Sequence, residues 1–164
     1  MILVDTSVYI EALADKELEE KLRGAGKKAF IISSEVIDDE IKEAVSFLRK
    51  TRRRDEAERL KEIYNSSTGG TIRLTHRVIN IAGFYSHEIT EKFGKNKSIE
   101  MKDDLRIVAS ASIAGLKYIA TFNRKTMANE EIIEIYNKMN NANKLRTPIF
   151  INAKKALFDL LSSG

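Results

Sequence analysis

Residues 2–7, Ile-Leu-Val-Asp-Thr-Ser, contain the pattern that decides the fold. Three apolar residues end at Asp5, and the two residues that follow, Thr6 and Ser7, can cap a helix. A short apolar run that leads directly into a helix is typical of the strand-helix units around a parallel sheet. The sequence therefore predicts a first strand over residues 2–4, with polar groups directly after its end.

Four more short apolar runs follow, separated by longer segments of helical period. Each run is enriched in Ile, Val, Leu or Phe, as expected of strands that are covered on both faces. The five predicted strands are Ile2–Val4, Ala29–Ile32, Ile72–Leu74, Tyr118–Ala120 and Ile149–Ile151. This alternation predicts an α/β protein with a mainly parallel sheet of four to five strands. No linker or internal repeat is visible, so residues 1–164 are expected to form a single domain.

Three segments show apolar residues at helical spacing. The first stripe consists of Val36, Ile37, Ile41, Ala44, Val45 and Leu48, and the second of Val78, Ala82, Phe84, Tyr85 and Ile89. A third helix is expected over residues 102–114, closed by Gly115. Residues 66–70 and 137–144 are rich in Ser, Gly or Asn, and they predict polar connections.

The composition excludes several classes of site. The 164 residues include no Cys and two His, so disulfides and thiolate sites are excluded and a multi-histidine zinc site is nearly so. The 28 Lys and Arg against 24 Asp and Glu give a net charge of +4, which weakly favours a polyanionic partner such as nucleic acid. The N-terminal residues lack the basic start of a secretory signal, and no apolar stretch is long enough to span a bilayer. We therefore expect a cytoplasmic protein without membrane association.

Acidic and polar side chains gather where the predicted strands end, which is where open parallel sheets bind ligands. Asp5 follows the first strand. Glu40 and Asp104 fall on the inward-facing stripes of two helices, where an unpaired charge is costly. The fourth strand is followed by Thr121 and Asn123. Because parallel strands end at the same edge of a sheet, these residues are candidates for one site.

The same residues also have structural interpretations. Asp5 is a good helix cap, and Asp103 with Asp104 suits the first turn of a helix. Glu40 could form a salt bridge at the edge of its stripe. Ordinary turn chemistry accounts equally well for Thr121 and its neighbours.

Carboxylates that converge at one edge repel one another, and a divalent cation relieves that repulsion. Oxygen donors favour Mg²⁺ or Mn²⁺, and such a site is suited to phosphodiester cleavage. Two other α/β classes fit less well. A phosphoreceiver domain needs an acid where Thr75-His76 follows the third strand, and a haloacid-dehalogenase-type phosphatase needs a second acid where Ser7 stands.

Four segments in this order resemble the PIN domain, and within it the VapC-type ribonuclease toxins of prokaryotes. They are Leu3 to Ser7, Ser34 with Val36 to Glu40, Asp103 to Ala111, and Ile119 to Asn123. The resemblance covers nearly the whole chain. It implies a three-layer α/β/α fold and an endoribonuclease, dependent on Mg²⁺ or Mn²⁺, that cleaves single-stranded or loop RNA. It also implies a homodimer and a cognate antitoxin, as in a toxin-antitoxin pair.

The resemblance also assigns roles to individual residues. Asp5, Glu40 and Asp104 match the three core acids that bind metal and carry catalysis. The supporting residues by motif position are Thr6, Ser7, Asp103, Thr121 and Asn123. Asn123 stands where many relatives carry a fourth acid, which removes one negative charge and should weaken binding of a second metal ion. This departure leaves open a weak or inactive PIN-like module that binds RNA or a partner protein.

A basic segment is the remaining candidate feature. It contains Arg49, Arg52, Arg53 and Arg54, which could bind the RNA backbone. The alternative is a solvated junction between two helices, since acidic residues follow directly and Asp55 is spaced to pair with Arg59.

Overall fold

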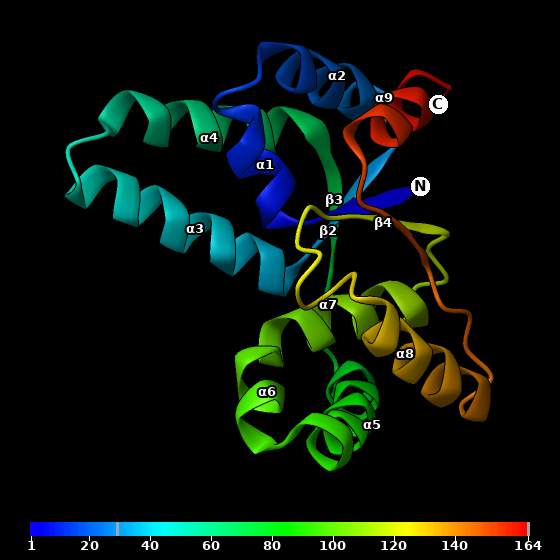
Figure 1. Ribbon diagram of the computed structural model, residues 1–164. Coiled ribbons are helices and arrows are strands. Elements are labelled where there is room, and N and C mark those ends of the chain that lie inside the picture. Colours follow the sequence, from blue (N-terminus) through cyan, green and yellow to red (C-terminus); the bar gives the residue numbers. More distant parts are fainter. Residues whose placement is uncertain (29, 164) are drawn as a thin grey trace.

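A parallel sheet lies between two layers of helices in the computed structural model, which describes residues 1–28 and 30–163 (Figure 1). Every adjacent pair of strands is parallel, and the order across the sheet is β3-β2-β1-β4-β5. The strands are β1 (Ile2–Val4), β2 (Ile31–Ser34), β3 (Thr68–Ile72), β4 (Tyr118–Ala120) and β5 (Ile149–Ile151). This confirms the predicted α/β class and the three-layer arrangement.

Within the described residues, eight helices form the two layers, four in each. One layer contains α1 (Thr6–Ala12), α2 (Lys16–Gly26), α4 (Arg54–Ser67) and α9 (Lys154–Ser163), and the other contains α5 (His76–Phe93), α6 (Lys95–Glu100), α7 (Lys102–Ile113) and α8 (Glu130–Ala142). The remaining helix, α3 (Glu35–Lys50), packs mainly against α4, and the two project together from the body of the molecule (Figure 1).

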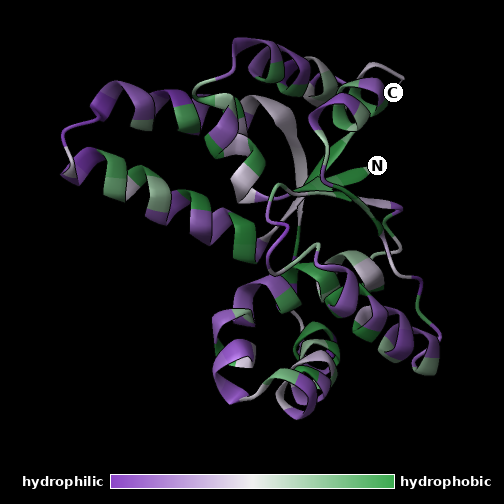
Figure 2. Cartoon of the chain, viewed as in Figure 1, coloured by the Kyte–Doolittle hydropathy of each residue, from purple (hydrophilic) through white to green (hydrophobic). Residues whose placement is uncertain are grey.

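Apolar residues concentrate in the strands and on the helix faces that turn toward them, whereas the far ends of α3 and α4 are hydrophilic (Figure 2). The strand β1 is fully buried, as expected for the central strand of a covered sheet. Because all the pairs of strands are parallel, the strands end at one edge of the sheet, and α1, α3 and α7 begin near this carboxyl edge.

The three strands β1, β4 and β5 confirm the sequence prediction to the residue. The other two strands exist, but their predicted bounds were wrong: β2 was expected over residues 29–32, and β3, expected over residues 72–74, spans Thr68–Ile72. β2 begins at Ile31 rather than at Ala29, which lies outside the described residues, and it extends through Ser34. β3 includes Gly69 and Gly70, which the sequence placed in a loop. Pairing with β2 decides this position, because Thr68 lies opposite Ile31 and Ile72 opposite Ser34.

Two helical predictions also need correction. The polar connection expected over residues 137–144 is largely helical, since α8 continues to Ala142. Asn140 is fully buried there, and its carboxamide is satisfied: the Tyr85 hydroxyl donates to its Oδ1 at 2.5 Å, and its Nδ2 donates to Ser112 Oγ at 3.1 Å. Phe84, counted in the second stripe, is 45% exposed. The expected end of α7 is confirmed, with Gly115 at a φ of 66°.

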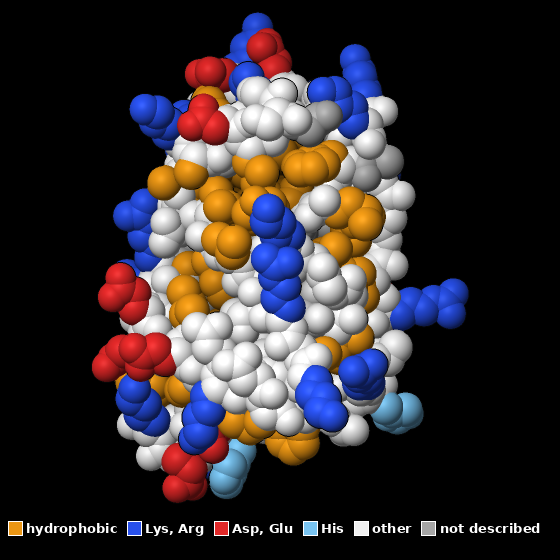
Figure 3. Space-filling model, turned by 90° about the vertical axis from the view of Figure 1, so that its right-hand side faces the viewer, with side chains coloured by type: hydrophobic (Ala, Val, Ile, Leu, Met, Phe, Trp, Pro, Cys, Tyr) orange, Lys and Arg blue, Asp and Glu red, His pale blue; other side chains and the backbone are white. Residues whose placement is uncertain are grey.

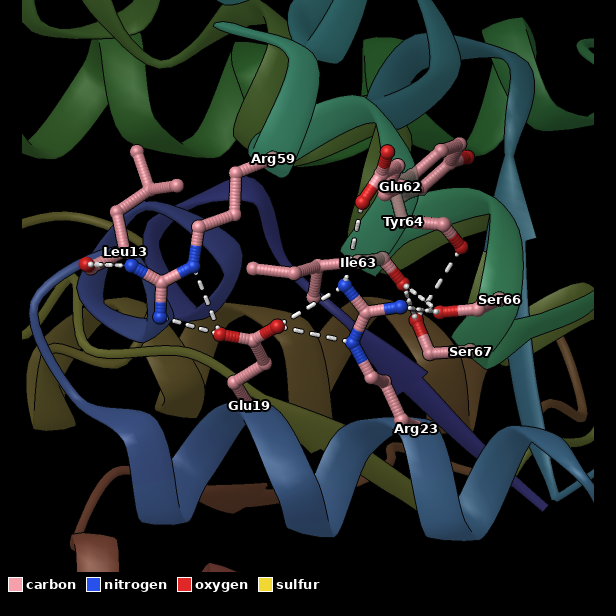
Figure 4. Close-up of polar contacts among 9 residues, drawn as sticks. All are labelled: Leu13, Glu19, Arg23, Arg59, Glu62, Ile63, Tyr64, Ser66 and Ser67. Atoms are coloured by element: carbon pink, nitrogen blue, oxygen red, sulfur yellow. Dashed lines mark hydrogen bonds and ion pairs between the residues drawn. The ribbon is translucent and has the colours of Figure 1, made fainter. Parts of the chain in front are cut away.

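An ion-pair cluster joins α2 to α4 (Figure 4). Glu19 accepts hydrogen bonds from Arg23 Nε and Arg59 Nε, each at 2.9 Å, and Arg59 Nη1 also donates to the carbonyl of Leu13 at 3.1 Å. Arg59 therefore does not make the expected pair with Asp55. Burial alone would raise the pKa of Glu19, but the hydrogen bonds from the two arginines outweigh it and hold the pKa below its usual value.

Replacing Glu19 by Gln should lower the free energy of unfolding by about 1.5–3 kcal/mol at pH 7, because charged hydrogen bonds are lost. A carboxylate with a depressed pKa stabilises the fold above its unfolded pKa of about 4.3, and this contribution is lost as the pH falls further. The difference between wild type and variant should therefore shrink in urea titrations below about pH 4. Glu62→Gln is the control, since Glu62 is exposed and 3.8 Å from Arg23. An equal loss from both variants would contradict this account.

The face at the right of Figure 1 is shown in Figure 3. Apolar side chains show between Lys and Arg side chains on this face, and acidic side chains lie mainly toward its margins. No helix within residues 1–28 and 30–163 combines the length and the hydropathy that a bilayer-crossing segment requires.

Candidate active site

Asp5 stands at the junction of β1 and α1, next to the end of β4. Its backbone N–H donates to the carbonyl of Ala120 at 2.9 Å. Its carboxylate Oδ2 accepts from Ser7 N–H at 3.3 Å, from Ser7 Oγ at 2.5 Å and from Thr121 Oγ1 at 2.9 Å. Asp5 therefore caps α1, as its structural interpretation predicts, and it also faces the carboxyl edge of the sheet.

Glu40 is half-buried on the side of α3 that turns toward α1. Thr6 Oγ1 donates to Glu40 Oε2 at 2.5 Å, so the partner of this carboxylate is a hydroxyl rather than a cation. The start of α3 is fixed by Ser34, whose Oγ accepts from the N–H of Ile37 at 3.3 Å. Because this cap fixes the residue at which α3 begins, it also determines which side of the helix Glu40 occupies, and that side lies opposite the start of α1.

Asp104 lies in the first turn of α7 and is half-buried. Its Oδ2 accepts from Thr126 Oγ1 at 2.5 Å and from Asn123 Nδ2 at 3.5 Å. The side-chain Oδ1 of Asn123 in turn accepts from the Thr126 N–H at 3.2 Å. The carboxamide thus helps to orient Asp104.

The three acids line one shallow cavity of about 460 Å³. Its walls are formed by Asp5, Thr6, Ser7, Glu40, Glu43, Ala44, Phe47, Asp104 and Asn123. Four of these side chains are carboxylates, and none is Lys or Arg. Each of the three predicted acids is held by hydroxyl groups through one of its two oxygens. Asp5 Oδ1, Glu40 Oε1 and Asp104 Oδ1 accept no hydrogen bond from the described residues, so each acid keeps an oxygen for a ligand.

The electrostatics of this cavity favour a cation. Burial is the main reason that the pKa of Glu40 is raised to about 7; the charges of Asp5 and Asp104 raise it further, and the hydrogen bond from Thr6 opposes the shift. Burial likewise raises the pKa of Asp104 to about 6, assisted by Asp5 and opposed by the Thr126 hydroxyl. A positive ion would lower both pKa values.

The donor set is compatible with Mg²⁺ or Mn²⁺, because it consists of oxygen atoms alone. Within the described part of the chain, no three His, Cys, Asp or Glu side chains lie close enough together to hold a metal ion by themselves. Mg²⁺ does not need such a group, since in proteins it usually keeps several waters and binds one or two carboxylates together with substrate phosphates. The chemistry of the cavity therefore fits the ion that the sequence predicts.

The other predicted site residues divide between the cavity and its surroundings. Thr121 is fully buried behind Asp5 and supports it. Asp103 is exposed, lies 3.8 Å from Arg106 Nη1 and is not part of the cavity wall. Asp38 is not part of this cavity wall, and it accepts hydrogen bonds from the Tyr64 hydroxyl and from Ser33 Oγ.

Sequence reasoning missed Thr126, Glu43 and Phe47. No motif pointed to Thr126, which lies in a loop after β4 and reaches Asp104 through tertiary structure. Glu43 and Phe47 had a signal, because they lie three and seven residues after Glu40 and therefore share its side of α3.

The four arginines line a separate cavity of about 590 Å³ at the junction of α3 and α4, together with Asp55 and Glu56. Arg49 pairs with Glu58 at 2.5 Å, and Arg53 pairs with Glu56. Both ion pairs are exposed to solvent at this junction, and binding of the RNA backbone by the four arginines stays a prediction. Arg49 lies nine residues beyond Glu40, about 14 Å along α3.

Comparison with known proteins supports the fold. No family model and no curated protein matches the chain. In a search of solved structures, the chain is similar to one from the crystal structure of VapBC2 from Rickettsia felis bound to a DNA fragment from their promoter. The match covers 94% of this chain and 100% of that one, with a TM-score of 0.60 and 18% identity. This similarity agrees with the three-layer fold and the parallel sheet.

Proposed function

We propose that this chain, which has the fold of the PIN domain, is a divalent-metal-dependent endoribonuclease that cleaves single-stranded or loop RNA. The observation that carries the proposal is the cavity at the carboxyl edge of the sheet. There, Asp5, Glu40 and Asp104 are each fixed by a hydroxyl at one oxygen and open at the other. Four carboxylates without a lining cation would repel an RNA phosphate, so phosphate binding requires a metal ion.

The chain contributes position and charge to this reaction. Asp5, Glu40 and Asp104 would hold Mg²⁺ or Mn²⁺, which when bound neutralises phosphate charge and makes water a better nucleophile. Thr6, Ser7, Thr121 and Thr126 restrict the carboxylate rotamers. Such supporting hydrogen bonds reduce the reorganisation that the site needs when a ligand binds. Asn123 holds Asp104 by its amide and adds no charge.

Cleavage of a labelled single-stranded RNA of mixed sequence tests the proposal. Wild-type protein should cleave it with Mn²⁺ or Mg²⁺, and excess EDTA should abolish cleavage. The same sequence annealed to its complement should be cleaved much more slowly, because the shallow cavity must admit a single phosphate backbone. Cleavage that persists in EDTA would overturn the metal-dependent mechanism.

The pH dependence of Mn²⁺ binding provides a prediction from the raised pKa values. Between about pH 4 and 7 the folded metal-free protein binds more protons at Glu40 and Asp104 than the unfolded chain. The contribution of these two groups to the free energy of unfolding therefore falls as pH rises through this window. Metal binding must displace these protons, so Mn²⁺ affinity measured by calorimetry should rise about tenfold or more from pH 5.5 to 7.5.

The variant Glu40→Gln is the control for this measurement, because it removes the group with the higher pKa. It should bind Mn²⁺ more weakly and with a smaller pH dependence. Equal Mn²⁺ affinities at the two pH values in the wild type would contradict the assignment of these acids as ligands.

The second candidate is a PIN-like module that binds RNA or a partner without cleaving it. Two observations favour it: the amide of Asn123, and the absence of a closed three-acid group in the described chain. A wild type that binds the labelled RNA in Mn²⁺ and leaves it intact would support this candidate.

The biological setting that we propose is a toxin-antitoxin pair. The similarity to a chain of VapBC2 supports a cognate antitoxin as partner. Expression of this chain should arrest the growth of its host, and co-expression with the protein encoded beside it should relieve that arrest. The homodimer stays a prediction, and sedimentation equilibrium would test it by measuring the mass of the protein in solution.

A further inference from the structure

Phe47 is an exposed aromatic residue in the wall of the acidic cavity. It is 62% exposed, although its neighbour Leu48 and nearby Val45 on α3 are buried. Spacings of four and three residues place Glu40, Ala44 and Phe47 on one side of the helix. The ring therefore belongs to the face of α3 that carries the acid, and the fold does not bury it.

We infer that Phe47 is a stacking platform for one unpaired base of the RNA strand whose phosphate lies at Asp5, Glu40 and Asp104. This inference rests on the proposed nuclease function and adds a base subsite to it. A nucleotide has two chemically different parts, and the cavity has two matching regions. The acids with their metal ion accept the charged phosphate, and the aromatic ring offers an apolar face to a base.

The length of α3 fixes the position of this subsite. Phe47 lies seven residues from Glu40, which is about 10.5 Å along the helix axis. A base can stack on Phe47 only where its neighbours in the strand leave one of its faces open, so the base on Phe47 belongs to an unstacked nucleotide close to the cleaved bond. A base in a duplex is covered on both faces by its neighbours. The subsite therefore selects single strands and loops.

The experiment combines changes in the ring with changes in the RNA. Phe47→Ala and Phe47→Leu should raise KM by roughly 5- to 150-fold, the range for loss of one stacked base, and should change kcat little. Phe47→Tyr should retain a wild-type KM, because it retains the ring. Phe84→Ala is the control, since Phe84 is an exposed aromatic residue outside this cavity.

An abasic scan of the substrate identifies the partner base. Removal of one base close to the cleaved bond should raise the wild-type KM as much as Phe47→Ala does. The two changes together should have no larger effect than either alone, because they remove the same contact. Abasic sites elsewhere should affect wild type and variant equally.

Several outcomes would overturn the inference. One is a wild-type KM for both Phe47→Ala and Phe47→Leu. Another is that, at every position of the RNA, the increase in KM from an abasic site and the increase from Phe47→Ala multiply. Loss of dimers or of antitoxin binding in Phe47→Ala, with unchanged KM, would assign the ring to a protein interface.

A wild type that cleaves no RNA contradicts the nuclease proposal itself. Stacking on the ring is then tested with a single-stranded oligonucleotide that carries 2-aminopurine, whose fluorescence is quenched when the base stacks. Quenching by wild type and Phe47→Tyr, but not by Phe47→Leu, supports stacking. Equal quenching by all three overturns it.

Discussion

The single variants Asp5→Asn and Asp104→Asn should each have a kcat/KM for RNA cleavage that is lower than that of the wild type by more than about 100-fold. Loss of a partner that merely orients a metal ligand costs about 10–100-fold, so loss of a ligand should cost more. Asn retains the shape of Asp and can still cap α1 at position 5, which protects the fold. The measurement is initial cleavage rate with Mn²⁺, with circular dichroism as a check on folding.

Two further variants show whether the loss is specific. Asp39→Asn is the matched control, since Asp39 is exposed and pairs with Lys42 at 2.9 Å outside the cavity. Its activity should equal that of wild type. Thr126→Val removes the hydroxyl that holds Asp104 and should cost about 10–100-fold. Full activity in Asp104→Asn would remove this residue from the site.

The second large effect is on stability and comes from Gly26 near the end of α2. A Cβ atom here would lie 2.3 Å from the carbonyl oxygen of Ser66 and 2.3 Å from the Cα of Ser67. Both atoms belong to the backbone at the end of α4, so no side-chain rotation can relieve the clash. Gly26→Ala should therefore lower the free energy of unfolding by about 3 kcal/mol or more.

Gly24 provides a matched control on the same helix. A Cβ atom there would meet no atom within 4 Å, and the position is exposed. Gly24→Ala should raise the free energy of unfolding by about 0.5–1 kcal/mol, because Ala loses less entropy than Gly in a helix. Urea unfolding of the two variants measures both effects. Equal free energies of unfolding for the two variants would contradict the close approach of α2 to α4 at Gly26.

The sequence predicted the three strands that consist of consecutive apolar residues and failed where tertiary contacts override composition. The fully apolar β1 is recognisable from its three residues alone. The strand β3 contains Gly69 and Gly70 and exists because β2 lies beside it. Likewise, Asn140 is a polar residue in a buried helix, and its hydrogen bonds to Tyr85 and Ser112 are invisible in a linear pattern.

The candidate site was predictable to the extent that its residues follow strands or fall on helical stripes. Strand ends and spacing made Asp5, Glu40 and Asp104 candidates for one site, and the resemblance to the PIN domain identified them as its three acids. The structure lines one cavity with all three. Thr126 could not be predicted, because its contact with Asp104 depends on a loop path between β4 and α8. The exposure of Phe47 also depends on how α3 packs.

Cleavage of single-stranded RNA by wild type and by the Asp5→Asn/Asp104→Asn double variant, run in parallel with Mn²⁺, Mg²⁺ or EDTA, tests the central claim most directly. The account predicts cleavage by wild type with either metal, none in EDTA, and none by the folded double variant. Equal cleavage by the two proteins would contradict the assignment of this cavity as the active site.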